Sequence, residues 1–275
     1  MAGISDGSSR SDWRGRDALS MVPAMTGSSV ARAAFWALIC CVLAVPAAAG
    51  APARRPVVVE LFTSQGCSSC IPADALLAKL THRPDVLPLS MSITYWDMLG
   101  WKDTLASETN TRRQKAYAAI LGHGAVYTPQ MIIDGTTDVV GSREGQVLSA
   151  IDAHEHDADT PSIPVSMHET KSELQIGVGG GSFDRSAAPA TVWMFHIRNA
   201  ATVAVGGGEN SGRTMTYHNV VGDLRAVGQW KGEPLSIDLP REAMEGLPHD
   251  SVAVIVQHGG YGHIVGAAVL SHPEF

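Results

Sequence analysis

The chain has 275 residues, of which 45% are hydrophobic and 17% charged, and its net charge at pH 7 is −7. This composition is typical of a globular protein with a sizeable core, and the length suits one large or two small domains. The negative net charge and the lack of a basic run argue against nucleic acid as a partner.

Residues 1–49 have the pattern of a secretory signal peptide rather than of a folded segment. A basic residue precedes the apolar stretch 33–45, and an Ala-x-Ala site then favours cleavage after Ala49. The signal peptide would have an ordinary length if translation began at Met21 or Met25, so we expect a start later than Met1. The apolar stretch is too short to span a bilayer. We therefore expect an exported protein, periplasmic or secreted, without stable membrane insertion after cleavage; an uncleaved N-terminal anchor is the alternative.

After this cleavage, two of the four cysteines remain, Cys67 and Cys70. Residues 50–56 form a linker, residues 57–63 are an apolar strand, and residues 73–80 have the pattern of an amphipathic helix. A Cys-x-x-Cys between a strand and a helix N-terminus indicates a thioredoxin-like redox site. The partial positive charge and free N–H groups of a helix N-terminus favour a thiolate, which is the form that attacks a disulfide.

Residues 57–159 alternate between strand and helix patterns. The expected elements are strand 57–63, helix 67–80, strand 86–93, helix 105–121, strands 130–133 and 137–140, and helix 144–156. Asp134-Gly135, between the two short strands, is a hairpin signal. We therefore expect an α/β domain with the order strand, helix, strand, helix, strand, strand, helix.

From residue 160 to residue 275 the pattern changes to short strands separated by Gly-rich turns. The expected strands are 163–167, 174–178, 191–198, 202–205, 214–221, 235–238, 251–257 and 263–270. Strands at this spacing without helices between them predict an all-β antiparallel sandwich-like domain.

The order of elements in residues 57–159, with Cys-x-x-Cys after the first strand, resembles the thioredoxin fold. Thr128-Pro129 stands just before strand 130–133, where thioredoxin-like proteins have a cis-proline facing the two cysteines. The resemblance implies that Pro129 is cis and that Thr128 presents backbone groups to a substrate chain. A cis X-Pro bond is uncommon and usually functional.

Four segments together resemble a family of exported bacterial proteins of unknown function, DUF1223: FTSQGCSSCIPAD, YWDMLGWKD, TPQMIIDG and GENSGR followed by YHNVV. The resemblance covers most of residues 57–270 and implies a thioredoxin-like domain joined to a β-rich C-terminal half, without a biochemical function. Two features depart from the best-known thioredoxins. Gly66 stands where an aromatic residue usually precedes the first cysteine, and Ser68-Ser69 separates the two cysteines.

The function predicted from these residues is thiol–disulfide exchange on protein thiols or disulfides, with an unknown redox partner and no cofactor. Cys67 would be the nucleophile and Cys70 the resolving cysteine. Three alternatives remain at this point. First, the pair can form an inert disulfide, although closing so small a loop adds little stability. Second, it can bind a metal together with a histidine; copper fits better than zinc, which usually needs four ligands, because the chain has no second cysteine pair. Third, the chain can be a non-catalytic partner-binding module.

Glu60 interrupts the first apolar strand seven residues before Cys67. Thioredoxins keep a buried carboxylate near the second cysteine, so the resemblance suggests Glu60 as a proton relay whose pKa burial would raise. Alternatively, Glu60 pairs with Lys102 or a surface arginine, or its side chain leaves the sheet.

Three aromatic residues, Tyr95, Trp96 and Trp101, follow the second predicted strand. Aromatic side chains in a loop near a redox site are suited to docking a peptide or an apolar ligand. The alternative is that they fill the interface between the two halves of the chain.

The histidines give weaker signals. His154 and His156, with Asp157 and Asp159, have the residue types of a metal site, but solvated residues at a helix C-terminus explain them equally well. In the C-terminal half, His218 and Asn219 follow the Gly-rich loop 208–213, which can bind a polar ligand or serve as a long turn. We assign no metal site from the sequence.

Overall fold

The computed structural model describes residues 54–122, 124–157, 162–184, 186–244 and 249–271. The predicted signal peptide and the first residues of the predicted linker, 50–53, lie outside the described residues. The described residues belong to one compact unit, Gly50–Phe275. Within them, no helix combines the length and the apolar character that crossing a bilayer requires.

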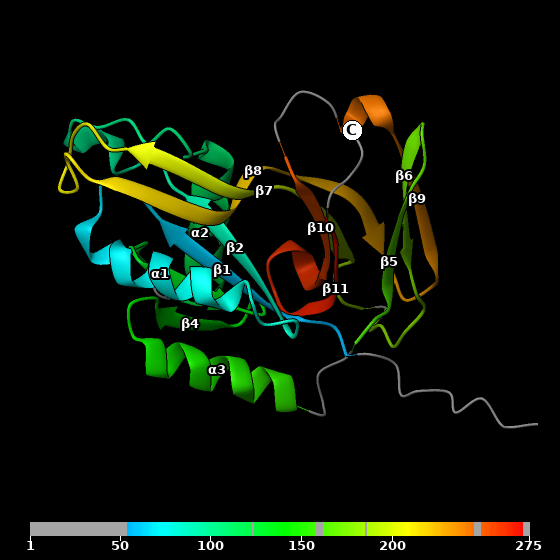
Figure 1. Cartoon of the computed structure of the whole chain (residues 1–275). Coiled ribbons are helices and arrows are strands. Elements are labelled where there is room, and N and C mark those ends of the chain that lie inside the picture. Colours follow the sequence, from blue (N-terminus) through cyan, green and yellow to red (C-terminus); the bar gives the residue numbers. More distant parts are fainter. Residues whose placement is uncertain (1–53, 123, 158–161, 185, 245–248, 272–275) are drawn as a thin grey trace, which may run out of the picture. The chain divides into compact units, whose positions relative to one another are not determined.

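The first half of the described chain alternates strands and helices in the predicted order (Figure 1). Its elements are β1 (Val57–Thr63), α1 (Ile71–Leu80), β2 (Val86–Ser92), α2 (Glu108–Ile120), β3 (Gln130–Ile133), β4 (Thr137–Val140) and α3 (Glu144–His156). The second half consists mainly of strands, namely β5 (Val165–Glu169), β6 (Glu173–Val178), β7 (Ala190–Ala204), β8 (Thr214–Trp230), β9 (Leu235–Pro240), β10 (Ser251–Gln257) and β11 (Ile264–Ser271). Short 3-10 turns are η1 (Ser68–Cys70), η2 (Asp97–Leu99), η3 (Arg241–Ala243) and η4 (His258–Gly260).

Eight of these strands form one mixed sheet in the order β11-β10-β7-β8-β2-β1-β3-β4. β1 is parallel to β2 and antiparallel to β3. The two halves of the chain meet where β2 and β8 pair at Ser90 and Val220. The fold is therefore a mixed α/β structure with a large sheet and few helices, and strands from both sides of residue 160 share this sheet. The predicted domain boundary near residue 160 stays a prediction.

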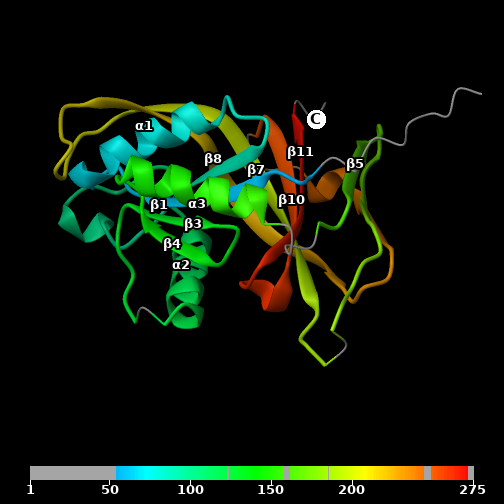
Figure 2. The ribbon, with the colours of Figure 1, turned by 90° about the horizontal axis from the view of Figure 1, so that it is seen from below.

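Helices cover both faces of the sheet around β1, which explains why this strand is apolar at almost every position. Val57, Val59 and Leu61 pack with α1 and α3 in one core cluster. Val58 and Phe62 point to the opposite face and pack with Tyr117 of α2 and with β2. Figure 2 shows the ribbons of α1, α2 and α3 around β1. A strand buried on both faces cannot show polar alternation. Its one charged residue, Glu60, is therefore buried as well.

In the second half, a three-stranded sheet, β5-β6-β9, lies against the large sheet. Apolar side chains of β6, such as Leu174 and Ile176, pack with those of β7 and β10 in a shared core. The expectation of separate strands at 191–198 and 202–205 was wrong, because β7 runs through both. β8 likewise continues to Trp230, beyond the expected end at residue 221. The antiparallel β7–β8 pairing absorbs the irregular positions as register shifts, so cross-strand pairing overrides the local breaks.

The helix starts also differ from the predicted ones, for local reasons. α1 begins at Ile71, after η1, and carries a proline in its first turn, where the missing N–H is not needed. α2 begins at Glu108, because the Ser107 side chain accepts a hydrogen bond from the Asn110 N–H as an N-cap. The predicted hairpin at Asp134-Gly135 is present, and the Thr136 N–H donates to the Ile133 oxygen across this turn. The φ values of Asp134 and Gly135 are 47° and 75°, the left-handed conformations of the two central residues of such a turn.

Candidate functional site

Cys67 and Cys70 lie between the end of β1 and the start of α1. Their sulfur atoms are at disulfide-bonding distance and their Cα atoms are 5.5 Å apart. A hydrogen bond of 3.2 Å from the Cys70 N–H to the Cys67 oxygen closes the loop between them, and the Cys67 N–H donates to the Ser64 oxygen at 3.1 Å. Both cysteines are fully buried, whereas Ser68 and Ser69 between them are exposed. Neighbouring groups therefore cover the two cysteines, although the two serines between them are exposed.

Thr128 is one of the covering groups. The Thr128–Pro129 peptide bond is cis, as the resemblance implied. The Thr128 hydroxyl donates to the Cys67 sulfur at 3.4 Å. Trp96 Nε1 in turn donates to the Thr128 oxygen at 2.8 Å. The residue before the cis-proline therefore contacts the first cysteine, and an aromatic residue from the predicted docking segment holds it in place.

The aromatic segment after β2 encloses the cysteine loop. Trp96 lies against Gly66, where an added Cβ would be 3.7 Å from the tryptophan side chain. Trp101 Nε1 donates to the Gln65 side chain at 2.8 Å, and the Trp101 ring packs on Gly206. Tyr95 is half-buried, and burial raises the pKa of its hydroxyl to about 12. The predicted substrate-binding residues thus lie around the cysteine loop; their binding of a substrate stays a prediction.

The loop between β7 and β8 caps the cysteine motif from a position more than 140 residues away in sequence. The buried Asn210 side chain donates to the backbone oxygens of Gln65 and Cys67, both at 3.0 Å. The Glu209 carboxylate accepts from the Ser68 N–H at 2.9 Å and from its hydroxyl at 2.7 Å. These two bonds lower the pKa of Glu209. From its sequence, this loop is a candidate for binding a polar ligand or a long turn; its contact with the cysteines comes from the tertiary structure.

A buried acidic group follows the cysteines in the chain. Asp74 is in the first turn of α1, four residues after Cys70, so both residues share one face of the helix. Burial raises the pKa of Asp74 to about 8, while the nearby Thr63 hydroxyl lowers it and Asp103 raises it. Neither Asp74 oxygen makes a hydrogen bond of normal geometry with the described residues. Sequence reasoning missed Asp74, although an aspartate on an apolar helix face was a visible signal.

Asp103 also lies close to the cysteine loop. Its carboxylate accepts from the Gln65 N–H at 2.7 Å and from the Leu105 N–H at 2.8 Å. Burial raises its pKa, and these backbone hydrogen bonds partly offset the effect. Asp103 therefore has backbone partners that Asp74 lacks, and its position supports the loop that leads into the first cysteine.

Glu60, the predicted proton relay, has a different partner. It accepts from Arg113 Nε at 2.9 Å and from Nη2 at 2.6 Å, and both side chains are buried. Arg113 also donates to the Tyr117 hydroxyl and to Gln257, each at 2.9 Å. Glu60 belongs to the sheet face covered by α2, whereas α1 and its Asp74 pack on the opposite face. Glu60 thus pairs with an arginine, as one of the alternatives expected, but this arginine is buried rather than at the surface.

The predicted histidine sites are dispersed. His156 is exposed and contacts the Asp152 backbone oxygen, whereas His154 points to Thr137 and Asp134. Asp159 lies outside the described residues. In the second half, the Asn219 amide donates to the Pro88 oxygen at 2.9 Å, which ties β8 to β2. The Asn219 side chain, next to His218 in the sequence, is therefore occupied by a bond between two strands.

Comparisons with known proteins agree with this architecture. The chain matches the family described as "Protein of unknown function (DUF1223)" over residues 58–257. Among curated proteins no match was found. The crystal structure of protein AGR_C_4864 from Agrobacterium tumefaciens is 36% identical in sequence with a TM-score of 0.71, and the match covers 82% of this chain and 98% of that one.

A second solved structure shares the fold at low sequence identity. HBP35 of Porphyromonas gingivalis is 12% identical with a TM-score of 0.55, and the match covers 80% of this chain and 76% of that one. At this identity the likeness concerns the fold alone. The family match spans most of the described residues, and the Agrobacterium protein is related along nearly its whole length. The chain therefore belongs to the DUF1223 family.

Proposed function

We propose that this protein is an exported, thioredoxin-like thiol–disulfide oxidoreductase that acts on protein thiols or disulfides through Cys67 and Cys70. The observation that carries the proposal is the contact between the Thr128 hydroxyl and the Cys67 sulfur, beside a cis-proline and at the start of α1. This contact supports the proposal, because a substrate chain bound along Thr128 would meet the Cys67 sulfur. The order of elements in residues 57–156 supports a thioredoxin-like unit.

In the reducing direction, a Cys67 thiolate attacks a substrate disulfide, forming a mixed disulfide and releasing one substrate thiolate. Cys70 then loses its proton and attacks the Cys67 sulfur, which reforms the Cys67–Cys70 disulfide and releases the second substrate thiolate. Two electrons pass to the substrate. In the oxidising direction the same steps run in reverse, and a second thiol–disulfide protein restores the starting state of the pair.

We assign the proton transfer at Cys70 to Asp74 rather than to Glu60. Asp74 lies one helical turn from Cys70, and its carboxylate has no strong partner to compete for a proton. Glu60 is held by Arg113 on the other sheet face, so its carboxylate is already compensated. A group whose pKa is about 8 can both accept and release a proton near neutral pH.

The enclosure of the cysteines adds a requirement to this function. Because Cys67 and Cys70 are fully buried, a substrate must displace Trp96 or the Glu209–Asn210 cap before it reaches the Cys67 sulfur. The exposed side chains of Met98 and Leu99, 84% and 52% exposed, lie in the same aromatic segment. We propose that they contact apolar side chains of the substrate chain next to its cysteine.

The copper alternative would need a histidine beside the two cysteines. Within the described parts of the chain, the donor group with three members does not include either cysteine. No specific observation therefore favours that alternative. The partner-binding alternative predicts that both cysteines can be replaced without a phenotype.

The proposal is tested by trapping. The Cys70→Ser variant should accumulate a mixed disulfide between Cys67 and a substrate protein, because the resolving step is blocked. The Cys67→Ser variant, its matched control, should trap none and should lose exchange activity. Exchange that continues undiminished in Cys67→Ser would refute the proposal. If the trapping succeeds, titration of the wild-type pair against glutathione and dithiothreitol gives its reduction potential and so the direction of electron flow.

A further inference from the structure

Three side chains from distant segments converge away from the cysteines. Asp134 lies in the β3–β4 turn, His154 in α3, and His263 between η4 and β11. Each offers one ligand atom, and the three atoms lie within 4.8 Å of one another. From this arrangement we propose that Asp134, His154 and His263 bind a divalent transition-metal ion of the Zn²⁺ type.

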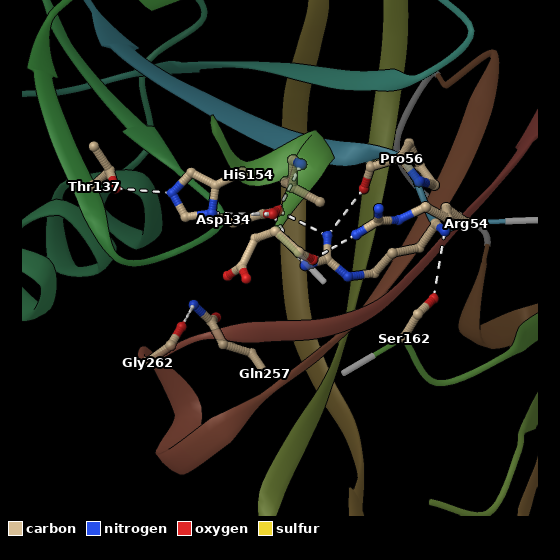
Figure 3. A network of polar contacts seen from close by, with 11 residues as sticks. Arg54, Pro56, Asp134, Thr137, His154, Ser162, Gln257 and Gly262 are labelled. Atoms are coloured by element: carbon tan, nitrogen blue, oxygen red, sulfur yellow. Dashed lines mark hydrogen bonds and ion pairs between the residues drawn. The ribbon is translucent and has the colours of Figure 1, made fainter. Parts of the chain in front are cut away.

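The orientation of Asp134 and His154 fits shared ligation (Figure 3). His154 Nδ1 is 3.7 Å from Asp134 Oδ2, and His154 Nε2 is 2.8 Å from the Thr137 hydroxyl. The first distance is too long for a hydrogen bond. It suits two ligands of one ion, since tetrahedral Zn²⁺ with bonds near 2.0–2.1 Å places its ligands roughly 3.3 Å apart. The contact with Thr137 holds the ring through its other nitrogen, as partners of metal-bound imidazoles do.

His263 supplies the third donor. Its Nε2 atom is buried and has no hydrogen-bond partner among the described residues. A buried imidazole nitrogen without a partner is costly, and a metal ion would satisfy it. Burial and the nearby Arg55 also lower the pKa of His263.

The backbone brings these segments together before any ion binds. The Ile264 N–H donates to the Asp134 backbone oxygen at 3.1 Å. At Gly135, an added Cβ would lie 2.2 Å from the Gly262 oxygen, so only glycine allows this close approach. The turn that carries Asp134 and the turn that carries His263 are therefore in direct contact. A small cavity of about 50 Å³ lies beside His154 and is also bordered by Arg55 and Glu155.

Arg55 sets the strength of this site. Its guanidinium donates to Asp134 Oδ1 at 2.9 Å and to Oδ2 at 3.0 Å, and the Val58 N–H also donates to Oδ1. These bonds orient the carboxylate, but the positive charge of Arg55 opposes a second cation nearby. We therefore expect Zn²⁺ to bind more tightly when this charge is removed, which a purely structural salt bridge does not predict.

The test is calorimetric titration of the purified, oxidised protein with Zn²⁺, together with the absorption spectrum of bound Co²⁺. We expect one ion per chain. His154→Gln and His263→Gln should each weaken binding at least about tenfold, whereas His156→Gln, exposed on the same helix, should leave it unchanged. Arg55→Gln should strengthen it. Circular dichroism of each variant confirms that the fold is intact.

Two results would overturn the proposal. One is the absence of Zn²⁺ and Co²⁺ binding by the folded wild-type protein. The other is binding that survives both His154→Gln and His263→Gln, which would place the ion elsewhere. The double variant Cys67→Ser/Cys70→Ser should retain the ion, so a failure of the proposed redox function and a failure of this site can be told apart.

Discussion

The Asn210 amide donates to the Cys67 backbone oxygen at 3.0 Å, although 143 residues separate the two in sequence. The same amide also donates to the Gln65 oxygen. A loop of the β-rich half thus closes over the cysteine motif of the α/β half. This contact couples the accessibility of the disulfide to the β7–β8 loop.

Asn210→Ala should loosen this cover. The change leaves two buried backbone oxygens without their donor, which costs about 1–3 kcal/mol of folding free energy. We expect a lower urea midpoint and a several-fold faster reduction of the disulfide by dithiothreitol, measured by alkylation of the released thiols. Ser211→Ala, in the same loop, serves as the control. An unchanged reduction rate in Asn210→Ala would show that the loop does not limit access.

Glu209→Gln should change the redox potential rather than the accessibility. In the folded protein the Glu209 carboxylate lies on the Ser68 N–H and hydroxyl, next to Cys67. Its negative charge opposes a Cys67 thiolate, so its removal stabilises the reduced pair. We expect the reduction potential to rise by on the order of 10 mV, and by less at high salt. A potential that falls, measured against glutathione, would contradict this electrostatic assignment.

Asp74→Asn should alter the pH dependence of both stability and exchange. The folded protein keeps the Asp74 proton up to about pH 8, whereas the unfolded chain loses it near the ordinary value of 3.8. Rising pH across this window therefore favours the unfolded state, by up to about 1.4 kcal/mol per pH unit. The variant should lack this decline in urea unfolding between pH 4 and pH 8.

Exchange kinetics supply the second measurement for Asp74. Wild-type exchange should accelerate as the pH rises through about 8, because the deprotonated Asp74 accepts the Cys70 proton. Asp74→Asn should resolve the mixed disulfide more slowly and lose this step in its pH profile. Equal profiles for the two proteins would exclude Asp74 as the proton acceptor.

Glu60→Gln tests whether the Glu60–Arg113 pair is structural. Removing one partner of a buried ion pair typically costs about 3–5 kcal/mol, so the variant should be markedly less stable in denaturant. The exchange rate per folded molecule should stay unchanged. Glu144→Gln, which breaks the exposed Lys79–Glu144 pair, should cost less than about 1 kcal/mol. A stable but inactive Glu60→Gln protein would return the relay role to Glu60.

Local sequence patterns were sufficient for most of the α/β half. The apolar run 57–63, the Asp134-Gly135 turn and the pattern of residues 144–156 each predicted the observed element, because strand burial, turn geometry and helix periodicity depend on neighbouring residues. The cis bond at Pro129 followed from the resemblance. In the β-rich half, local breaks near residues 199–201 misled the prediction, since pairing with β8 carries β7 through them.

By itself, the sequence determined the cysteine motif, its position before a helix and the residue types around it. Only the tertiary structure decided which groups meet: Asn210 with Cys67, Glu60 with Arg113, and Asp134 with His154 and His263. These contacts join residues that are far apart in the chain and come from the order of strands in the sheet. A pattern of neighbouring residues contains no record of that order, because loop closure and packing over the whole chain select it.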